Sequence, residues 1–250
     1  IIVFKKDMKN TKPYVLMQKI ILFFALICFS FYVLTGDNKL SDSHIADEHL
    51  HKSLKLVVFE SETCGACKSF KKDVSNDWKS NITLQNTFDF ASTQDQELLK
   101  EVWATPTIVM FKDGREVSRY TGYDGNQHAF WKWFGMEILT PEQKKIAFES
   151  GTERAFTGSL LDNDATGYYV DPITGDKLFR SDTKFTSGTG WPSFFDPMPG
   201  ALTFKDDGRR IEVLSASSGI HLGHVFNDGP PPSGKRYCIN SAVLKFVADE

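Results

Sequence analysis

The chain has 250 residues, a length that predicts one large or two ordinary domains. Apolar residues make up 41% and charged residues 24%, as in ordinary folded proteins, and the net charge of −3 gives no reason to expect nucleic acid as a partner. Four cysteines are too few for a disulfide-stabilised scaffold and favour redox chemistry instead: Cys28, Cys64, Cys67 and Cys238.

Residues 1–36 have the pattern of a membrane or export segment. Lysines precede an uncharged apolar run from Ile20 to Gly36, whose length is at the short end for a membrane span. Positive charge before such a run predicts that the N-terminus stays in the cytoplasm and that the remainder is exported, to a periplasmic or other extracytoplasmic location. We expect a signal anchor, with a cleaved signal peptide as the alternative, and a polar linker over residues 37–40.

The next stretch places two cysteines where a strand gives way to a helix. Residues 54–59 are apolar and predict a buried strand, which Cys64 and Cys67 follow closely as a Cys-x-x-Cys pair. Apolar residues then recur every four positions from Phe70 to Trp78, as on one face of a helix. The amides and dipole at a helix N-terminus stabilise a thiolate on the first cysteine. Half of a zinc site is the alternative, but zinc needs three or four ligands and the chain has no second such pair.

Residues 41–136 resemble thioredoxin. The resemblance rests on Cys64-Gly-Ala-Cys67 and on Thr105-Pro106, which matches the cis-proline that faces the family's active-site cysteines. It implies an α/β fold, a redox-active disulfide between Cys64 and Cys67, and a cis bond before Pro106. The sequence departs from ordinary thioredoxin between the cysteines, which enclose Gly-Ala rather than Gly-Pro. The elements expected after the first helix are strands at 82–90, 108–111 and 116–121 and helices at 94–103 and 126–139.

The second half of the chain has a different pattern. Thr140 predicts a helix N-cap, with Pro141 at the first helical position. After residue 158, short apolar runs are interrupted by Gly, Asp, Ser and Pro, which is typical of an antiparallel β domain. We therefore expect two folded domains after the N-terminal segment, at residues 41–136 and 140–250.

The most informative run lies near the C-terminus. Two positive residues precede Cys238, and adjacent positive charge favours the nucleophilic thiolate. His221 and His224 lie upstream, separated from it by the turn-forming residues 228–234, which can fold the chain back. A nucleophile, proton donors and the amide of Asn240 can therefore converge. The alternative is a buried core cysteine with two ordinary loop histidines.

This run resembles the end of the methionine-R-sulfoxide reductases, the B type of peptide methionine sulfoxide reductase. Further matching motifs follow one another in the right order over roughly residues 140–247: Gly151–Gly158, Leu178-Phe179, Lys184-Phe185 and Gly190–Phe194. The resemblance implies an enzyme, a thiol-dependent peptide-methionine (R)-S-oxide reductase, whose partners are oxidised proteins carrying methionine-R-sulfoxide.

The resemblance also implies roles for individual residues. Cys238 attacks the sulfoxide sulfur as a thiolate and becomes a sulfenic acid. His224, and after it His221, holds or donates the proton that the leaving oxygen needs, since the pKa of histidine lies near working pH. Asn240 forms a hydrogen bond at the site, and Arg236 lowers the pKa of the thiol.

Three further residues complete the expected site. Asp228 orients a histidine or a water molecule. Trp191 and Phe194 bind the substrate, and the flat apolar face of Trp191 meets the methyl group of the sulfoxide. The alternative for Trp191 is a core aromatic residue.

The chain lacks thiols that many members of this family carry. Many members hold a structural zinc on two Cys-x-x-Cys pairs, and we expect neither zinc nor another cofactor, because the corresponding positions carry other residues: Asp171, Thr174, Ser215 and Ser218. Many members also have a resolving cysteine where this chain has Thr189. A sulfenic acid on the nucleophile would therefore have no partner within its own domain.

We hypothesise that the Cys64–Cys67 pair is the built-in reductant of Cys238. Tethering raises the effective concentration of the second domain, although a short connection could instead direct the exchange to a second molecule or a separate reductant. Outside the cytoplasm dithiols tend to become oxidised, so the pair needs electrons from a membrane thiol carrier.

Two other functions compete with this one. A membrane-tethered thiol–disulfide oxidoreductase would use its C-terminal domain only to bind clients, and such a module has no need of Cys238 together with His221, His224, Trp191 and Asn240. A purely structural zinc-binding module fails because the chain offers too few ligands.

Overall fold

The computed structural model describes residues 53–88 and 96–249. The expected export segment at 1–36 and the linker at 37–40 lie outside these residues, as does the beginning of the first expected domain. Within the two described ranges, no helix is both long and apolar enough to cross a membrane.

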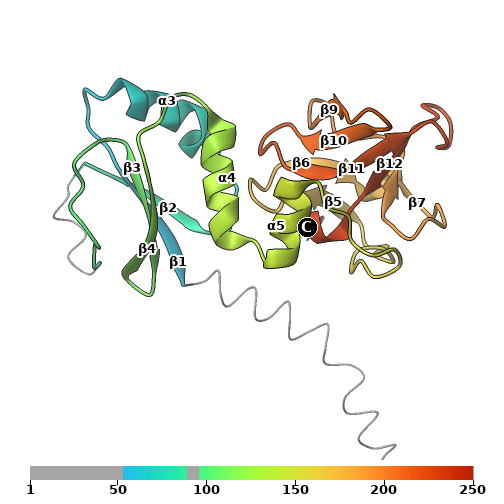
Figure 1. Ribbon diagram of the computed structural model, residues 1–250, viewed down its shortest axis with the longest axis horizontal. Coiled ribbons are helices and arrows are strands. Elements are labelled where there is room, and N and C mark those ends of the chain that lie inside the picture. Colours follow the sequence, from blue (N-terminus) through green and yellow to red (C-terminus); the bar gives the residue numbers. More distant parts are fainter. Residues whose placement is uncertain (1–52, 89–95, 250) are drawn as a thin grey trace, which may run out of the picture. The chain divides into compact units, whose positions relative to one another are not determined.

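The first folded part is an α/β structure around a four-stranded sheet (Figure 1). The strands lie in the order β2 (Thr83–Thr87), β1 (Leu54–Phe59), β3 (Thr107–Lys112) and β4 (Arg115–Thr121). β1 pairs with β2 in parallel and with β3 in antiparallel orientation, and β3 and β4 form a hairpin. The strands predicted at these positions are confirmed, and the mixed sheet agrees with the expected thioredoxin-like topology.

Two of the predicted helices are present in this part, although the first ends at Asp73, before the expected apolar positions Val74 and Trp78. α3 spans Gly65–Asp73 and begins directly after Cys64, and α4 spans Gln127–Ile138. Phe70 of α3 and Phe130 of α4 meet edge to face at 4.9 Å in the core. The two helices therefore pack on the same face of the sheet.

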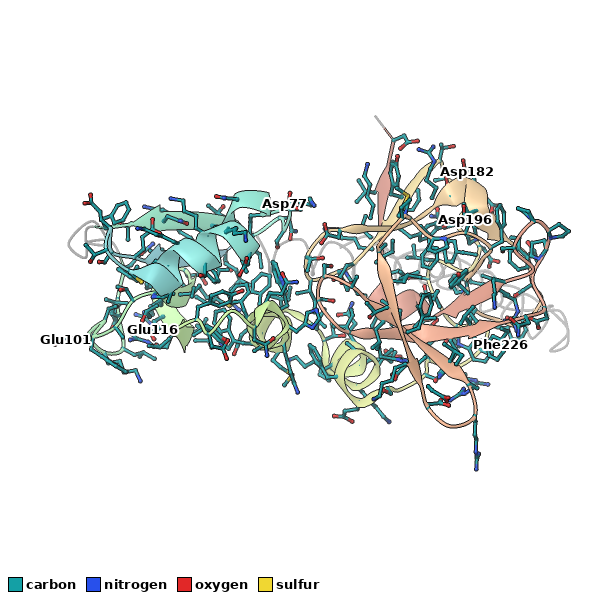
Figure 2. All side chains as sticks on the ribbon, turned by 90° about the horizontal axis from the view of Figure 1, so that it is seen from above. Asp77, Glu101, Glu116, Asp182, Asp196 and Phe226 are labelled. Carbon is teal, nitrogen blue, oxygen red and sulfur yellow. A yellow bond between two sulfur atoms is a disulfide. The ribbon has the colours of Figure 1, made fainter. Side chains whose placement is uncertain are left out.

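Among the described residues, a loop packs on the opposite face of the sheet. The hydrophobic cluster on this face contains alternate residues of the two central strands and two loop residues: Val57, Phe59, Val109, Phe111, Leu98 and Val102. The helix predicted at 94–103 is wrong in its described part, which is irregular. The buried Glu116–Arg119 ion pair explains this, because Arg119 binds the carbonyls of Lys100 at 2.8 Å and Glu101 at 3.2 Å. Figure 2 labels Glu101, which lies in this loop, and Glu116, whose carboxylate binds Arg119.

The second folded part is mainly antiparallel β structure preceded by one helix, α5 (Pro141–Glu149). Its larger sheet has the order β7-β8-β12-β11-β10-β9 and its smaller sheet the order β13-β5-β6 (Figure 1). The strands are β5 (Gly167–Val170), β6 (Lys177–Arg180), β7 (Lys184–Phe185), β8 (Ser193–Phe194), β9 (Leu202–Asp206), β10 (Ile211–Ser215), β11 (His221–Phe226), β12 (Arg236–Ile239) and β13 (Lys245–Ala248). Short 3-10 helices occupy Ser75–Asp77, Ser181–Thr183 and Ser241–Val243.

Side-chain contacts join the two folded parts, which belong to one compact unit. Lys79 binds Asp176 with a distance of 2.6 Å between Nζ and Oδ1. Gly135 of α4 lies so close to Ile173 that a Cβ added to the glycine would clash with that side chain. A larger residue at position 135 would therefore require the side chains of Ile173 and Phe148 to shift.

Helix α5 begins with the cap that the sequence predicted. Thr140 Oγ1 accepts a hydrogen bond from the Gln143 amide at 3.3 Å, and the Gln143 side chain accepts one from the Thr140 amide at 2.9 Å. This reciprocal capping box satisfies two amides that a helix leaves without an internal partner. Pro141 at the first turn has no amide hydrogen to satisfy.

The capping box gives a stability prediction. Thr140→Ala should lower the free energy of unfolding by about 1 kcal/mol, because one amide at the start of α5 loses its acceptor. The thermal midpoint should fall by about 2–4 °C. Thr140→Ser is the matched control and should stay near wild type, since serine keeps the hydroxyl. Equal midpoints for the alanine and serine variants would show that the cap contributes nothing.

Candidate active site

The register of the larger sheet assembles a row of polar side chains. Directly opposed residues of antiparallel strands project to the same face of a sheet. Cys238 of β12 lies opposite His224 of β11 on one side and Ser193 of β8 on the other. His224 in turn lies opposite Glu212 of β10. Neighbouring strands therefore bring a thiol, an imidazole and a carboxylate to one face.

His221, at the start of β11, is held by a buried carboxylate. Its Nδ1 lies 2.7 Å from Oε1 of Glu212, which also accepts a 2.7 Å hydrogen bond from the hydroxyl of Ser150. Burial lowers the pKa of His221, and the charge of Glu212 opposes this change. Burial works against ionisation of Glu212 itself, but the bond from Ser150 and the charge of His221 hold its pKa below the ordinary value.

The second ring nitrogen of His221 is available to bind a substrate. Nε2 of His221 is buried and has no hydrogen-bond partner in the part of the chain that the structure describes. The rings of His221 and His224 lie with their centroids 5.2 Å apart in an edge-to-face arrangement. A buried nitrogen without a partner is costly unless a water or ligand binds it, so it marks a functional position.

His224 has an acidic neighbour of its own. Its Nε2 lies 3.3 Å from Oδ2 of Asp207, in the loop between β9 and β10. Amides of Arg209 and Arg210 bind this carboxylate and lower the pKa of Asp207 to about 2. Burial and the nearby charge of Arg210 lower the pKa of His224, while Asp207 works in the other direction. For both histidines burial is the largest influence on the pKa and lowers it.

The environment of Cys238 differs from the one that the sequence predicted. Burial raises the pKa of the Cys238 thiol above its ordinary value. The charge of Arg236 and hydrogen bonds from Thr189 and Arg236 lower it again without cancelling the effect of burial. Lys235, the other positive neighbour, is exposed and binds Asn227 at 2.6 Å instead. Arg236 therefore acts on the pKa of Cys238 in the expected direction, and burial is the larger, opposing influence that the sequence did not reveal.

Arg236 and Asp228 form a pair with each other. The guanidinium donates two hydrogen bonds of 2.9 Å to the two carboxylate oxygens and lies over the ring of Phe226, 4.5 Å from its centroid. The end of β11 that carries Phe226 is marked in Figure 2. Asp228 was expected to orient a histidine or a water. The structure shows that its carboxylate holds the cation next to Cys238.

The side chain of Asn240 connects backbone segments that carry residues of the site. Its Oδ1 accepts a hydrogen bond from the Glu153 amide at 3.0 Å, and its Nδ2 donates one to the Leu222 carbonyl at 3.0 Å. The buried carboxylate of Glu153 accepts the amides of Ser241 and Ala242. The Asn240 side chain therefore ties the segment that follows β12 to β11 and to the segment before residue 158.

The two expected substrate-binding aromatic residues lie in different environments. Trp191 is half-buried and donates from its indole nitrogen to the Glu153 carbonyl at 3.2 Å, so its ring has a fixed orientation. Phe194 is completely buried and stacks on Phe179 with 4.3 Å between the ring centroids. The alternating strand β8 turns Phe194 into the core, so the structure corrects its assignment as a substrate contact.

The four positions at which zinc thiols were not expected, Asp171, Thr174, Ser215 and Ser218, meet in a hydrogen-bonded cluster. Asp171 is completely buried and accepts hydrogen bonds from the amides of Ile173 and Thr174 and from the hydroxyls of Ser215 and Ser218. Burial raises the pKa of Asp171, and the hydroxyl groups oppose this rise. Structural zinc is bound by thiolates and imidazoles, so a carboxylate that is already hydrogen-bonded and three hydroxyls do not fit that ion.

The first domain presents its cysteine pair at a helix N-terminus. Cys64 and Cys67 form a disulfide, and the amide of Cys67 donates to Sγ of Cys64 at 3.0 Å. Sγ of Cys64 lies 3.3 Å from the carbonyl oxygen of Thr105. The bond between Thr105 and Pro106 is cis, as the resemblance to thioredoxin implied.

Comparisons with known proteins agree with this division of the chain. Residues 43–136 match the family described as thioredoxin-like domain, and residues 139–248 match the SelR domain family. The peptide methionine sulfoxide reductase MsrB of Methanosarcina barkeri is 50% identical over 125 residues, which are 48% of this chain and 85% of that protein. The chain belongs to the MsrB family of peptide methionine sulfoxide reductases.

Other relatives match different shares of the chain. The MsrB of Leptospira interrogans is 53% identical over 113 residues, 43% of this chain and 86% of that protein. The MsrA/MsrB protein of Vibrio cholerae is 36% identical over 204 residues, 78% of this chain and 53% of that protein. Among solved structures, the periplasmic thioredoxin SoxS of Paracoccus pantotrophus covers 34% of this chain and 95% of its own, with 24% identity and a TM-score of 0.31.

Three acidic residues of the MsrB domain were missed by sequence reasoning. Glu153 lies within the matched motif Gly151–Gly158, so the motif contained the signal. Glu212 is an acidic residue in an apolar strand, a pattern that indicates a buried partner. Asp207 lies in a polar hairpin loop, where no local pattern separates it from its acidic neighbour.

The buried Asp171 cluster gives a second stability prediction. Asp171→Ala should lower the free energy of unfolding by about 3 kcal/mol, because several buried donors lose their acceptor. The thermal midpoint should then fall by roughly 6–12 °C. Asp162→Ala, which removes an exposed carboxylate of the same domain, is the control and should change the midpoint little. A small effect of Asp171→Ala would contradict the structural role of the cluster.

The buried thiol gives a prediction on pH dependence. In full-length protein with the other three cysteines changed to serine, alkylation of Cys238 by iodoacetamide should have its midpoint above the ordinary thiol value of about 8.5. Arg236→Met should move the midpoint higher, because the thiolate loses a cation. Asp228→Asn should move it lower, since a nearby negative charge is removed. A wild-type midpoint below about 8 would contradict the effect assigned to burial.

Proposed function

We propose that the MsrB domain reduces the R epimer of methionine sulfoxide in proteins through Cys238. The sulfur of Cys238 attacks the sulfoxide sulfur, and the S–O bond of the substrate breaks as oxygen moves to the cysteine. The thiol becomes a sulfenic acid and the sulfoxide becomes methionine, a two-electron exchange that conserves every atom. Support comes above all from the register that sets Cys238 directly opposite His224.

The sulfoxide oxygen needs a proton as it leaves the substrate, and the thiol of Cys238 supplies it. In this proposal the reaction begins with the proton on sulfur, because burial raises the pKa of Cys238 and lowers the pKa of both histidines. His224 accepts it as the sulfur attacks and passes it to the sulfoxide oxygen, and Asp207 stabilises the imidazolium during the transfer. Nε2 of His221, which has no other partner among the described residues, binds the same oxygen.

Trp191 selects the methyl group of the substrate. Its indole nitrogen is bound by the Glu153 carbonyl, so the ring is held rigidly. A rigid flat apolar surface favours a methyl group over the polar oxygen of the wrong epimer. Stereochemical preference for the R form follows when the oxygen points to the histidines and the methyl group to the tryptophan.

The thioredoxin-like pair restores Cys238 in the second half of the cycle. The thiol of Cys64 attacks the sulfenic acid, a Cys64–Cys238 disulfide forms, and water leaves. The thiol of Cys67 then attacks Cys64, which releases the Cys238 thiol and leaves a Cys64–Cys67 disulfide. A cysteine at position 189 could have acted as a resolving partner within the same domain. The chain has Thr189 there, whose hydroxyl binds the thiol of Cys238, and this supports the route through Cys64.

The oxidised Cys64–Cys67 pair needs an external dithiol to complete the cycle. If residues 1–36 anchor or export the chain, the two domains work outside the cytoplasm, where dithiols tend to become oxidised. A thiol carrier embedded in the membrane is then the reductant of this pair. Oxidised proteins on the same side of the membrane are the substrates.

A turnover count tests both halves of the proposal. Fully reduced protein, freed from external reductant and given excess R-sulfoxide, should form two methionines per chain, one from Cys238 and one after it is restored by the pair. A Cys64→Ser/Cys67→Ser variant should form one, and the S epimer should give none.

Each other outcome has a definite meaning. One methionine per wild-type chain would show that the pair does not restore Cys238. No product from the R form, or equal product from both epimers, would contradict the assignment of Cys238. The rate of the second turnover should be independent of protein concentration when the exchange occurs within one molecule, and should rise with concentration when it occurs between two.

A further inference from the structure

Phe156 has a conformation and an exposure that are unusual for a phenylalanine. Its φ angle is 64°, in the left-handed region that bulky side chains rarely adopt, and 68% of the residue is exposed. A left-handed backbone and an apolar ring in water both cost free energy. Backbone strain of this kind persists at ligand-binding positions, where the surrounding structure maintains it.

The surroundings of Phe156 hold it firmly in place. Its amide donates a 2.8 Å hydrogen bond to the carbonyl of Gly190. The ring lies against Gly190, because a Cβ added there would come within 2.9 Å of two ring carbons. Three residues earlier in the chain, Glu153 is bound to Asn240 and to the indole of Trp191. The backbone of this segment is therefore held at Glu153 and at Phe156, and one edge of the exposed ring lies against Gly190.

The ring lies at the rim of the proposed substrate site. Gly190, which it contacts, is preceded by Thr189 and followed by Trp191. Thr189 binds the thiol of Cys238, and Trp191 is the proposed contact for the methyl group. A methionine sulfoxide in a polypeptide has chain on both sides of the reacting residue. The neighbouring residues of the substrate must therefore cross the rim that surrounds these groups.

We infer that Phe156 is a specificity residue that binds an apolar side chain next to the methionine sulfoxide in a polypeptide substrate. This inference rests on the proposed function and adds a subsite to it. An aromatic ring held rigidly binds with little loss of conformational entropy, so even a partial contact favours the substrate that can make it. The enzyme then prefers sulfoxides in apolar segments, the segments that are exposed when a damaged protein unfolds.

The test compares substrates with and without apolar neighbours, with dithiothreitol as reductant so that the Cys64–Cys67 pair is not needed. The substrates are N-acetyl-methionine-R-sulfoxide amide and two pentapeptides with a central R-sulfoxide, one flanked by glycine and one by leucine. Wild-type protein should have a KM about tenfold lower for the leucine peptide than for the glycine peptide, with similar kcat values.

Three variants at this position separate a binding role from a structural one. Phe156→Asn and Phe156→Gly both accept the left-handed conformation, and both should lose the preference for leucine while activity on the single-residue amide stays unchanged. Phe156→Tyr keeps the ring and should keep the preference. Phe204→Asn, which removes another exposed ring of the same domain, is the control and should behave like wild type.

The opposing outcomes are distinct. A wild-type enzyme with equal KM for the two peptides would overturn the inference. Equal loss of activity on all three substrates in Phe156→Asn and Phe156→Gly would also overturn it, because the ring would then only support the loop at Gly190. Absence of any R-sulfoxide reduction by wild-type protein would be recognised separately, since it would overturn the proposed function and this inference together.

Discussion

The antiparallel pairing of β11 with β12 is the constraint on which the active site depends. Because opposed residues share a face, this register alone sets His224 beside Cys238. The same register extends to Glu212 on the next strand, so acid, imidazole and thiol occupy one row. A shift of one residue would turn all of them to the other face, where Phe194 and its stacked partner fill the core.

Burial and charge act against each other throughout this row. Burial disfavours the charged form of a titratable group, so it raises the pKa of Cys238 and lowers the pKa of both histidines. Fixed partners have the opposite influence on these pKa values, since Arg236 faces the thiol and Glu212 binds His221.

A buried cluster of hydrogen bonds around Asp171 connects two loops of the MsrB domain. The Asp171 carboxylate joins the loop after β5 to the turn between β10 and β11, because donors from both segments meet on it. Charge-assisted hydrogen bonds are stronger than neutral ones, but they depend on exclusion of water. The residues proposed to carry the chemistry of both domains are thiols, Cys64 and Cys67 in the first domain and Cys238 in the second.

The sequence by itself determined the local features: the strand and helix types, the cap at Thr140, the Cys-x-x-Cys pair and the missing zinc thiols, because neighbouring residues encode them. Only the tertiary structure decided the state of Cys238, whose pKa depends on burial by residues distant in sequence. The tertiary structure also shows that Phe194 lies in the core and that Asp228 pairs with Arg236. A loop held by a buried ion pair takes the place of an expected helix. Such contacts arise between segments far apart in the chain, and periodicity and spacing describe only segments that are close together.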